Sequence, residues 1–319
     1  MKKEIKITNK IINDDSKPFI IAELSANHLG KIKIAKKLIL EAKKSGADAV
    51  KIQTYTADTM TINSSKKDFL VKSGIWKKKK LYDLYTKGFT PWSWHKELFN
   101  YARKNKIILF GTPYDETSLK FLKKLNNPIY KIASFEMNDH DLIKEALSTN
   151  KPIIISTGMS SIKEIDDMYS SIKNSKNKKI ILLHCISAYP SNYSDLNLKT
   201  IPTMKKKYNC VIGFSDHTLK IDSSLFAVAM GAKVIEKHLT LSRKMGGVDS
   251  KFSLEPHEFK KMTQMINDFF NWCVFALEVI GDFTGMGYEL ANIVIFVIIQ
   301  PGLILLFYIL WRNEKRKNK

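Results

Sequence analysis

Cysteine is scarce in this chain of 319 residues, which contains only Cys185, Cys210 and Cys273. Three scattered cysteines are too few for a disulfide framework or a structural zinc site. A secretory signal is also missing, because Met1 to Lys17 mixes Lys with Glu and Asp and leads into an apolar run of only a few residues. Both features are typical of a protein of the reducing cytoplasm.

Acidic residues are outnumbered: 31 Asp and Glu face 52 Lys and Arg, which gives a formal net charge of +21. Such a charge raises the question of a nucleic-acid partner. The lysines, however, are spread along the chain, and the one tight run, residues 77–80, falls in a loop-like stretch. We therefore predict no nucleic-acid partner, although the excess charge would help to attract a phosphorylated anion.

Short apolar runs alternate with amphipathic segments through most of the chain. One such segment, residues 161–174, opens on a serine with Glu164 three positions later, a capping-box pattern. The apolar runs are nearly continuous, as in parallel strands buried on both faces. Eight repeats over about 250 residues predict a (β/α)8 TIM barrel rather than a doubly wound sheet, within a domain of residues 1–271. The predicted strands are 19–24, 48–54, 107–112, 128–134, 152–157, 180–187, 210–215 and 233–238.

Two segments fall outside this repeat. Residues 55–91 form a long insertion after the second strand, of a size typical of a lid or substrate loop. No long apolar run occurs until residues 293–311, which are apolar apart from Gln300 and are followed by RNEKRKNK. That run is long enough to span a bilayer. It predicts an atypical tail, residues 272–319, with a transmembrane-like helix that would allow membrane association.

The charges around the tail conflict with this topology. A cytoplasmic barrel would leave the basic end outside, whereas basic ends favour the cytoplasm. The acidic flank bears Glu278, Asp282 and Glu289. We therefore hypothesise that the tail is foreign to the barrel and is not a working membrane anchor.

Polar residues gather where the predicted strands end, and in TIM barrels the site is built from those ends. Lys51 and Lys131, with neighbouring hydroxyls, would cradle a phosphate. His217 and His238 follow adjacent strands and would share one metal ion. Glu23 and Glu136 would handle protons or sugar hydroxyls. Two other histidines have structural interpretations, His184 in the core and His95 on a helix surface.

Seven segments carry a family resemblance: FIIAELSANHLG, GADAVKIQTYTADT, TPWSWHKELF, YKIASFEMND, KPIIISTGMSS, GFSDHT and VIEKHLTLSR. Together they resemble the N-acetylneuraminate synthase family, and most closely the pseudaminic acid synthases within it. The resemblance runs from about residue 19 to about 270, through all eight predicted strands. Relatives that act on N-acetylmannosamine more often read KIGSGE where this chain reads KIASFE.

The resemblance implies a reaction. Phosphoenolpyruvate would condense with 2,4-diacetamido-2,4,6-trideoxy-altropyranose and water, and phosphate would leave with C–O cleavage, in nonulosonate biosynthesis. The alternative products are N-acetylneuraminate and legionaminic acid. The family implies a divalent cofactor, Mn²⁺ or Mg²⁺.

The resemblance also assigns roles by position. The phosphoenolpyruvate site would comprise Lys51, Thr112, Lys131, Ser134, Ser156, Ser187 and Ser215. Ser187 departs from relatives that have Asn there, which weakens its assignment. The sugar site would comprise Gln53, Glu136, Tyr189 and Asp249. The metal would be held by His217 and His238, and Glu23 completes the catalytic set with them.

Other interpretations stay open. Lys131 could instead form a Schiff base, as in a lysine aldolase, or the chain could be an inactive membrane-tethered scaffold. The family usually continues into an antifreeze-like domain that crosses a homodimer and supplies an arginine to the partner's sugar site. Nothing similar follows Phe270 in this sequence. A homodimer is therefore expected from the family, but its usual support is not recognisable here.

Overall fold

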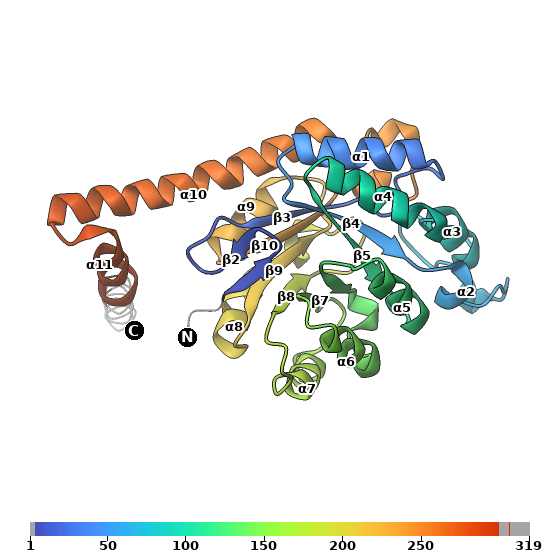
Figure 1. Ribbon diagram of the computed structural model, residues 1–319, viewed down its shortest axis with the longest axis horizontal. Coiled ribbons are helices and arrows are strands. Elements are labelled where there is room, and N and C mark those ends of the chain that lie inside the picture. Colours follow the sequence, from blue (N-terminus) through green and yellow to red (C-terminus); the bar gives the residue numbers. More distant parts are fainter. Residues whose placement is uncertain (1–3, 300–305, 307–319) are drawn as a thin grey trace, which may run out of the picture. The chain divides into compact units, whose positions relative to one another are not determined.

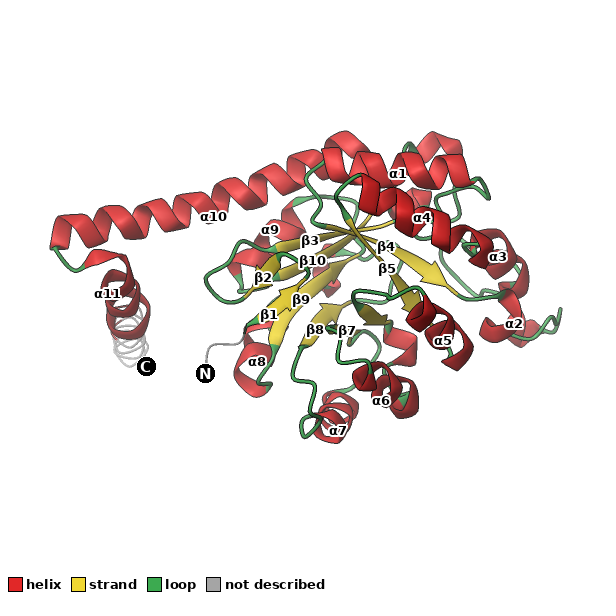
Figure 2. Cartoon of the chain, viewed as in Figure 1, coloured by secondary structure: helices red, strands yellow, loops and turns green. Residues whose placement is uncertain are grey.

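The computed structural model describes residues 4–299 and Leu306. It divides into two compact units, Met1–Ile266 and Asn267–Lys319, close to the boundary predicted after residue 271. Figure 1 follows the chain by colour and Figure 2 separates helices from strands. The strands are β1 (Ile5–Ile7), β2 (Lys10–Ile12), β3 (Phe19–Glu23), β4 (Ala49–Thr54), β5 (Ile108–Pro113), β6 (Tyr130–Ile132), β7 (Ile153–Ser156), β8 (Ile180–Cys185), β9 (Val211–Asp216) and β10 (Val234–His238).

Helices follow the strands of the first unit in alternation (Figure 2). The capping box at Ser161 and Glu164 is present: the Ser161 N–H donates to the Glu164 carboxylate (2.7 Å), and the Glu164 N–H donates back to the serine hydroxyl (3.2 Å). The α-helices are α1 (Ile32–Lys44), α2 (Ala57–Met60), α3 (Leu81–Gly88), α4 (Trp92–Lys104), α5 (Glu116–Lys124), α6 (His140–Ser148), α7 (Ile162–Ile172), α8 (Thr200–Lys207), α9 (Asp222–Ala229), α10 (Pro256–Thr284) and α11 (Gly287–Ile293).

The eight strands β3–β10 form one parallel sheet in the order β5-β4-β3-β10-β9-β8-β7-β6. The end strands β5 and β6 contact each other, so the sheet curls into a nearly closed barrel. The buried Asn127 amide fills the seam: it accepts from the Gly111 N–H (2.9 Å) and donates to the carbonyls of Gly111 (3.1 Å) and Ile129 (2.6 Å). The predicted (β/α)8 barrel is confirmed.

Side chains alternate along each strand between the barrel interior and the surrounding helices. The lower interior is apolar, because Phe19, Ile21 and Val234 pack there with Ile7 and Ile12 of the β1–β2 hairpin. Two residues further along each strand, the same inward row becomes polar. The barrel interior is therefore apolar at the amino ends of the strands and polar and charged at their carboxyl ends.

The second unit contains the rest of α10, then α11 and a π-helix at Val294–Ile299. Within residues 4–299 and Leu306, no helix is both long and apolar enough to cross a bilayer. The predicted transmembrane-like helix is therefore not supported. Most of its span, residues 300–305 and 307–311, lies outside the described residues.

Candidate active site

A cavity of about 470 Å³ opens at the carboxyl ends of the barrel strands. All but three of the predicted site residues line it. The exceptions are Glu23, Thr112 and Glu136. The lining residues that belong to the predicted set are Lys51, Gln53, Lys131, Ser134, Ser156, Ser187, Tyr189, Ser215, His217, His238 and Asp249. Within this set, residues from six of the eight strands or their following loops converge on one space, and Ser25 after β3 and Tyr114 after β5 add the other two.

The floor of the cavity is a buried charge network. Lys51 Nζ lies 2.7 Å from Glu23 Oε2 and 3.1 Å from Glu236 Oε1. Lys131 Nζ donates to Ser156 Oγ (2.7 Å) and lies 4.0 Å from Glu236 Oε1. Burying charges is tolerated only when they are paired. Glu23 therefore lies behind Lys51 as its counter-ion, which explains why it does not line the cavity.

Glu236 was missed by the sequence interpretation. Its carboxylate touches both lysines and accepts a hydrogen bond from Ser215 Oγ (3.1 Å). The missed signal was the two-residue period of a strand, since Glu236 precedes the predicted ligand His238 by two positions and must share its face. Lys237, between them, points to the other face and pairs with Asp216 (2.9 Å).

The two lysines respond differently to burial. Burial lowers the pKa of Lys131, and its more distant carboxylate does not fully compensate. Burial also opposes the charge of Lys51, but Glu23 and Glu236 outweigh it and raise the pKa of that lysine. Burial raises the pKa of Glu23 to about 7, with Lys51 limiting the rise. A carboxyl with this pKa can exchange a proton at neutral pH.

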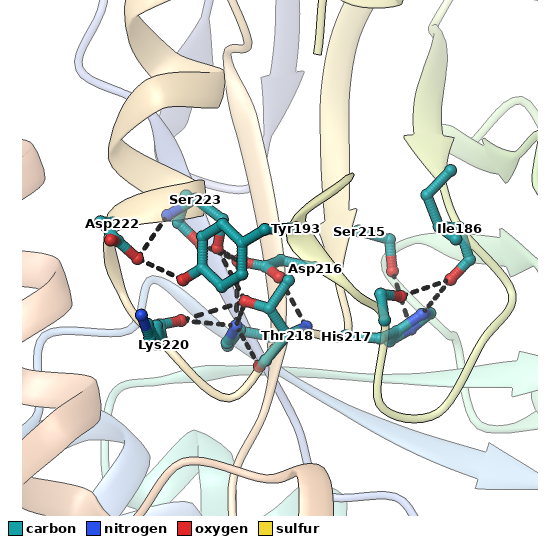
Figure 3. Close-up of polar contacts among 12 residues, drawn as sticks. Ile186, Tyr193, Ser215, Asp216, His217, Thr218, Lys220, Asp222 and Ser223 are labelled. Atoms are coloured by element: carbon teal, nitrogen blue, oxygen red, sulfur yellow. Dashed lines mark hydrogen bonds and ion pairs between the residues drawn. The ribbon is translucent and has the colours of Figure 1, made fainter. Parts of the chain in front are cut away.

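The predicted histidine pair comes together. The rings of His217 and His238 have centroids 5.4 Å apart. His217 Nδ1 lies 2.8 Å from the Ile186 carbonyl (Figure 3), so that nitrogen donates its proton to the carbonyl. Burial opposes the charge of this imidazole, but Cys185 outweighs it and raises the pKa of His217. His238 Nδ1 is buried and finds no hydrogen-bond partner among the described residues. Burial and nearby positive groups hold the pKa of His238 well below its usual range, which keeps this imidazole neutral.

These features fit a divalent metal. An imidazole oriented by a backbone carbonyl, as His217 is by Ile186, is a usual nitrogen ligand. In the part of the chain that the structure describes, no cluster of three or more His, Cys, Asp or Glu side chains is arranged to hold a metal. A metal at His217 and His238 would therefore take its remaining ligands from substrate and water.

A polar network outside the barrel fixes the loop that carries His217 (Figure 3). Asp216 accepts hydrogen bonds from Ser223 Oγ (2.6 Å) and from the Thr218 N–H (2.8 Å). Lys237 donates to the Thr218 carbonyl (2.6 Å) and completes the ion pair with Asp216. Because both charged side chains are fully buried, the network holds the turn after β9 in one conformation.

Two other histidines have structural roles. His184 is buried, and its Nε2 lies 2.7 Å from the Leu196 carbonyl, which confirms the core interpretation. The prediction that His95 lies on a helix surface was wrong, because His95 is fully buried and its Nε2 lies 2.8 Å from Thr54 Oγ1. The imidazole joins α4 to the end of β4. His95 precedes Leu98, Phe99 and Ala102 by three, four and seven residues, so it lies on the buried stripe of α4 that the helical period predicts.

Glu136 yields a prediction on stability. Burial raises its pKa to about 7, although Lys131 opposes the rise, and its Oε2 is buried without a hydrogen-bond partner in the described part of the chain. Its stabilising contribution is complete below about pH 4.5 and is lost as the pH rises through 7. We therefore expect the free energy of unfolding of Glu136→Gln, measured relative to wild type, to be about 1–3 kcal/mol higher at pH 8 than at pH 5.

Urea unfolding of both proteins at several pH values measures this difference. Asp141→Asn, at a carboxylate whose side chain is 95% exposed, serves as the control and should show no such pH-dependent gain. If Glu136→Gln is equally or more destabilised at pH 8, the buried carboxylate is well solvated or partnered, and the prediction is wrong.

Fold and site together define a (β/α)8 barrel of the kind that enzymes use, in which a lysine-lined pocket adjoins a histidine pair. The sequence matches the NeuB family over residues 38–273. The chain belongs to the NeuB family.

Relatives of known name agree with this assignment. The chain is 46% identical over 254 residues to a pseudaminic acid synthase of Campylobacter jejuni, covering 80% of this chain and 74% of the relative. It is 43% identical over 249 residues to the pseudaminic acid synthase of Helicobacter pylori, covering 78% and 73%. An N,N'-diacetyllegionaminic acid synthase of Campylobacter jejuni is 40% identical over 253 residues, with 78% and 75% covered.

Solved structures show the same fold. The N-acetylneuraminic acid synthetase of Leptospira borgpetersenii, solved in complex with citrate, superposes with a TM-score of 0.77 and 34% identity, covering 86% of this chain and 90% of that one. The spore coat polysaccharide biosynthesis protein SpsE of Bacillus subtilis gives a TM-score of 0.74 and 32% identity, with 89% and 74% covered.

Proposed function

We propose that this protein is a pseudaminic acid synthase. It condenses phosphoenolpyruvate with 2,4-diacetamido-2,4,6-trideoxy-altropyranose and water, and it releases phosphate. The similarity to pseudaminic acid synthases at 43–46% identity carries the choice of product. The observation that carries the chemistry is the pair Lys51 and Lys131, buried on one cavity floor beside the two imidazoles of His217 and His238.

The cavity floor provides a site for the anionic substrate. Lys51 and Lys131 would offset the charge of the phosphate and carboxylate, and preorganised donors of this kind stabilise charge that develops during reaction. Ser134, Ser156 and Ser215 would add hydroxyl donors. Thr112 is buried, and its hydroxyl finds no partner among the residues described, so it is available to a substrate oxygen after a small adjustment.

Bonds and protons then balance as follows. The methylene carbon of phosphoenolpyruvate attacks the sugar aldehyde carbon, and the aldehyde oxygen takes up a proton to become a hydroxyl. Water adds to the carbon that bears the phosphate. As that C–O bond breaks, the added hydroxyl passes one proton to the departing phosphate and becomes the ketone oxygen. Glu23 would accept the other proton of that water once Lys51, its partner at 2.7 Å, turns toward the phosphate and uncovers it, and its raised pKa suits this role. Phosphate departs with the bridging oxygen. A Mn²⁺ or Mg²⁺ ion held by His217 and His238 would supply Lewis-acid polarisation of the aldehyde.

The sugar preference gives a testable prediction. Phe135, beside Glu136 in KIASFE, lines the cavity, and an apolar ring favours a methyl group over a hydroxymethyl group. With phosphoenolpyruvate and Mn²⁺ present, kcat/KM for the 6-deoxy diacetamido sugar should exceed that for N-acetylmannosamine by about tenfold or more.

A phosphate-release assay with a panel of sugars measures this preference. The panel contains the altro-configured sugar, its stereoisomer that leads to legionaminic acid, and N-acetylmannosamine. Reactions without sugar provide the background. Equal or better turnover of N-acetylmannosamine, or of the legionaminic acid precursor, would reassign the product. Phosphate release that does not depend on any sugar would refute the proposed reaction.

A further inference from the structure

The insertion after β4 builds an apolar wall on the cavity. Met60, Val71, Trp76, Leu81 and Leu84 all line it. The predicted role of residues 55–91 as a substrate loop thus acquires a physical basis: the segment contributes side chains to the same space as the strand ends. This wall differs in chemistry from the charged floor, which belongs to the strands.

Trp76 is the best-fixed residue of that wall. Its indole N–H donates to the Val248 carbonyl (2.9 Å), immediately before Asp249 in the chain. Its ring centroid lies 5.9 Å from those of both Tyr189 and Phe252. The turn that carries Trp76 is closed by backbone bonds, including the one from the Val71 N–H to the Lys79 carbonyl (2.9 Å).

Trp76 therefore lies beside Tyr189 and Asp249, two residues predicted to bind the sugar. The lysines and serines of the floor match the phosphate and carboxylate of phosphoenolpyruvate, which leaves the apolar wall to the second substrate. Against a wall without charged groups, sugar hydroxyls would add little binding free energy, whereas buried methyl groups would add to it.

We propose that Trp76 determines sugar specificity by packing on methyl groups of the sugar, an inference that rests on the proposed function. The 6-deoxy diacetamido sugar carries three methyl groups, two in its acetamido substituents and one at carbon 6. N-acetylmannosamine carries one methyl group and replaces the methyl at carbon 6 by a hydroxymethyl group. Trp76 thus discriminates between the two by burial of their methyl groups against its ring, and its N–H bond to Val248 adds to the packing on Tyr189 and Phe252 that holds the ring.

The test compares wild type, Trp76→Ala and Trp76→Phe with both sugars. Trp76→Ala should lower kcat/KM for the diacetamido sugar about tenfold or more, mainly through the KM for that sugar. The loss with N-acetylmannosamine should be smaller, so the selectivity ratio falls. The KM for phosphoenolpyruvate should change less than about twofold, because the charged floor is untouched. Trp76→Phe keeps an aromatic ring but loses the N–H, so it should retain most of the selectivity.

Ile62→Ala is the matched control, since Ile62 belongs to the same insertion but is 69% exposed, and it should leave both sugars unaffected. Circular dichroism and thermal unfolding establish that each variant folds. An equal loss with both sugars would show that Trp76 only supports the loop, and an unchanged selectivity ratio in Trp76→Ala would overturn the inference. Failure of the wild type to use any sugar would instead refute the proposed function, so the two failures are distinguishable.

Discussion

Replacing Lys131 by methionine is expected to lower kcat/KM for phosphoenolpyruvate on the order of 10²–10³-fold, as loss of a preorganised donor to a charged substrate does. The fold should survive. Burial disfavours the charged form of Lys131 and lowers its pKa, so its removal relieves a cost at neutral pH. Glu236 keeps Lys51 as a partner at 3.1 Å, so no carboxylate is left unpaired.

Steady-state kinetics with varied phosphoenolpyruvate, together with thermal unfolding, measures both effects. Lys144→Met is the control, because that side chain is 58% exposed on α6. A KM for phosphoenolpyruvate that stays at the wild-type value in Lys131→Met would place the anion elsewhere. A lysine with a lowered pKa is also what a Schiff-base aldolase requires. We expect no borohydride trapping of substrate on Lys131, and stoichiometric trapping would favour that mechanism.

Replacing His238 by alanine is expected to reduce turnover by at least about 10³-fold, because an imidazole ligand and the Lewis-acid chemistry that it supports are lost together. His238 Nδ1 has no hydrogen-bond partner in the part of the chain that the structure describes, so truncation breaks no hydrogen bond of that atom there. The protein should therefore remain folded.

Mn²⁺ binding gives a readout that is independent of activity. Titration followed by electron paramagnetic resonance should show one bound Mn²⁺ in the wild type and strongly weakened binding in His238→Ala and His217→Ala. His184→Ala removes another buried imidazole, one that does not line the cavity, and it should bind Mn²⁺ normally. Undiminished Mn²⁺ binding by both ligand variants, or full activity in excess chelator, would contradict the metal assignment.

The barrel was predictable because its strands are short, apolar and regularly spaced, and burial on both faces makes them so. The site residues at the strand ends were predictable because they are polar or charged where the pattern is otherwise apolar. A lysine such as Lys51 within an apolar strand must meet a counter-ion or a ligand. The proximity of His217 and His238 could be predicted because adjacent parallel strands end on the same rim of the barrel.

Other features depend on contacts that no local pattern encodes. The β1–β2 hairpin was not predicted, since three residues per strand carry almost no periodic signal, yet Ile7 and Ile12 help to close the base of the barrel. The role of Glu236 depends on Lys51 and Lys131, which reach it from other strands, so the motif around it does not show this role. His95 was placed on the surface because histidine is polar, although it shares the buried stripe of α4 with Leu98 and Phe99 and contacts Thr54 of β4. Hydropathy alone predicted a membrane span that the described residues do not support.

The central claim is that phosphate leaves with cleavage of the C–O bond as the sugar is joined. The direct measurement uses phosphoenolpyruvate labelled with ¹⁸O at the bridging oxygen, incubated with the altro-configured 6-deoxy diacetamido sugar and Mn²⁺. Mass spectrometry of the products should find the label in the released phosphate, and a nine-carbon keto acid without it, in equal amounts. Unlabelled phosphate would mean cleavage of the P–O bond, and labelled phosphate without the nine-carbon acid would mean hydrolysis, so either result would contradict this account.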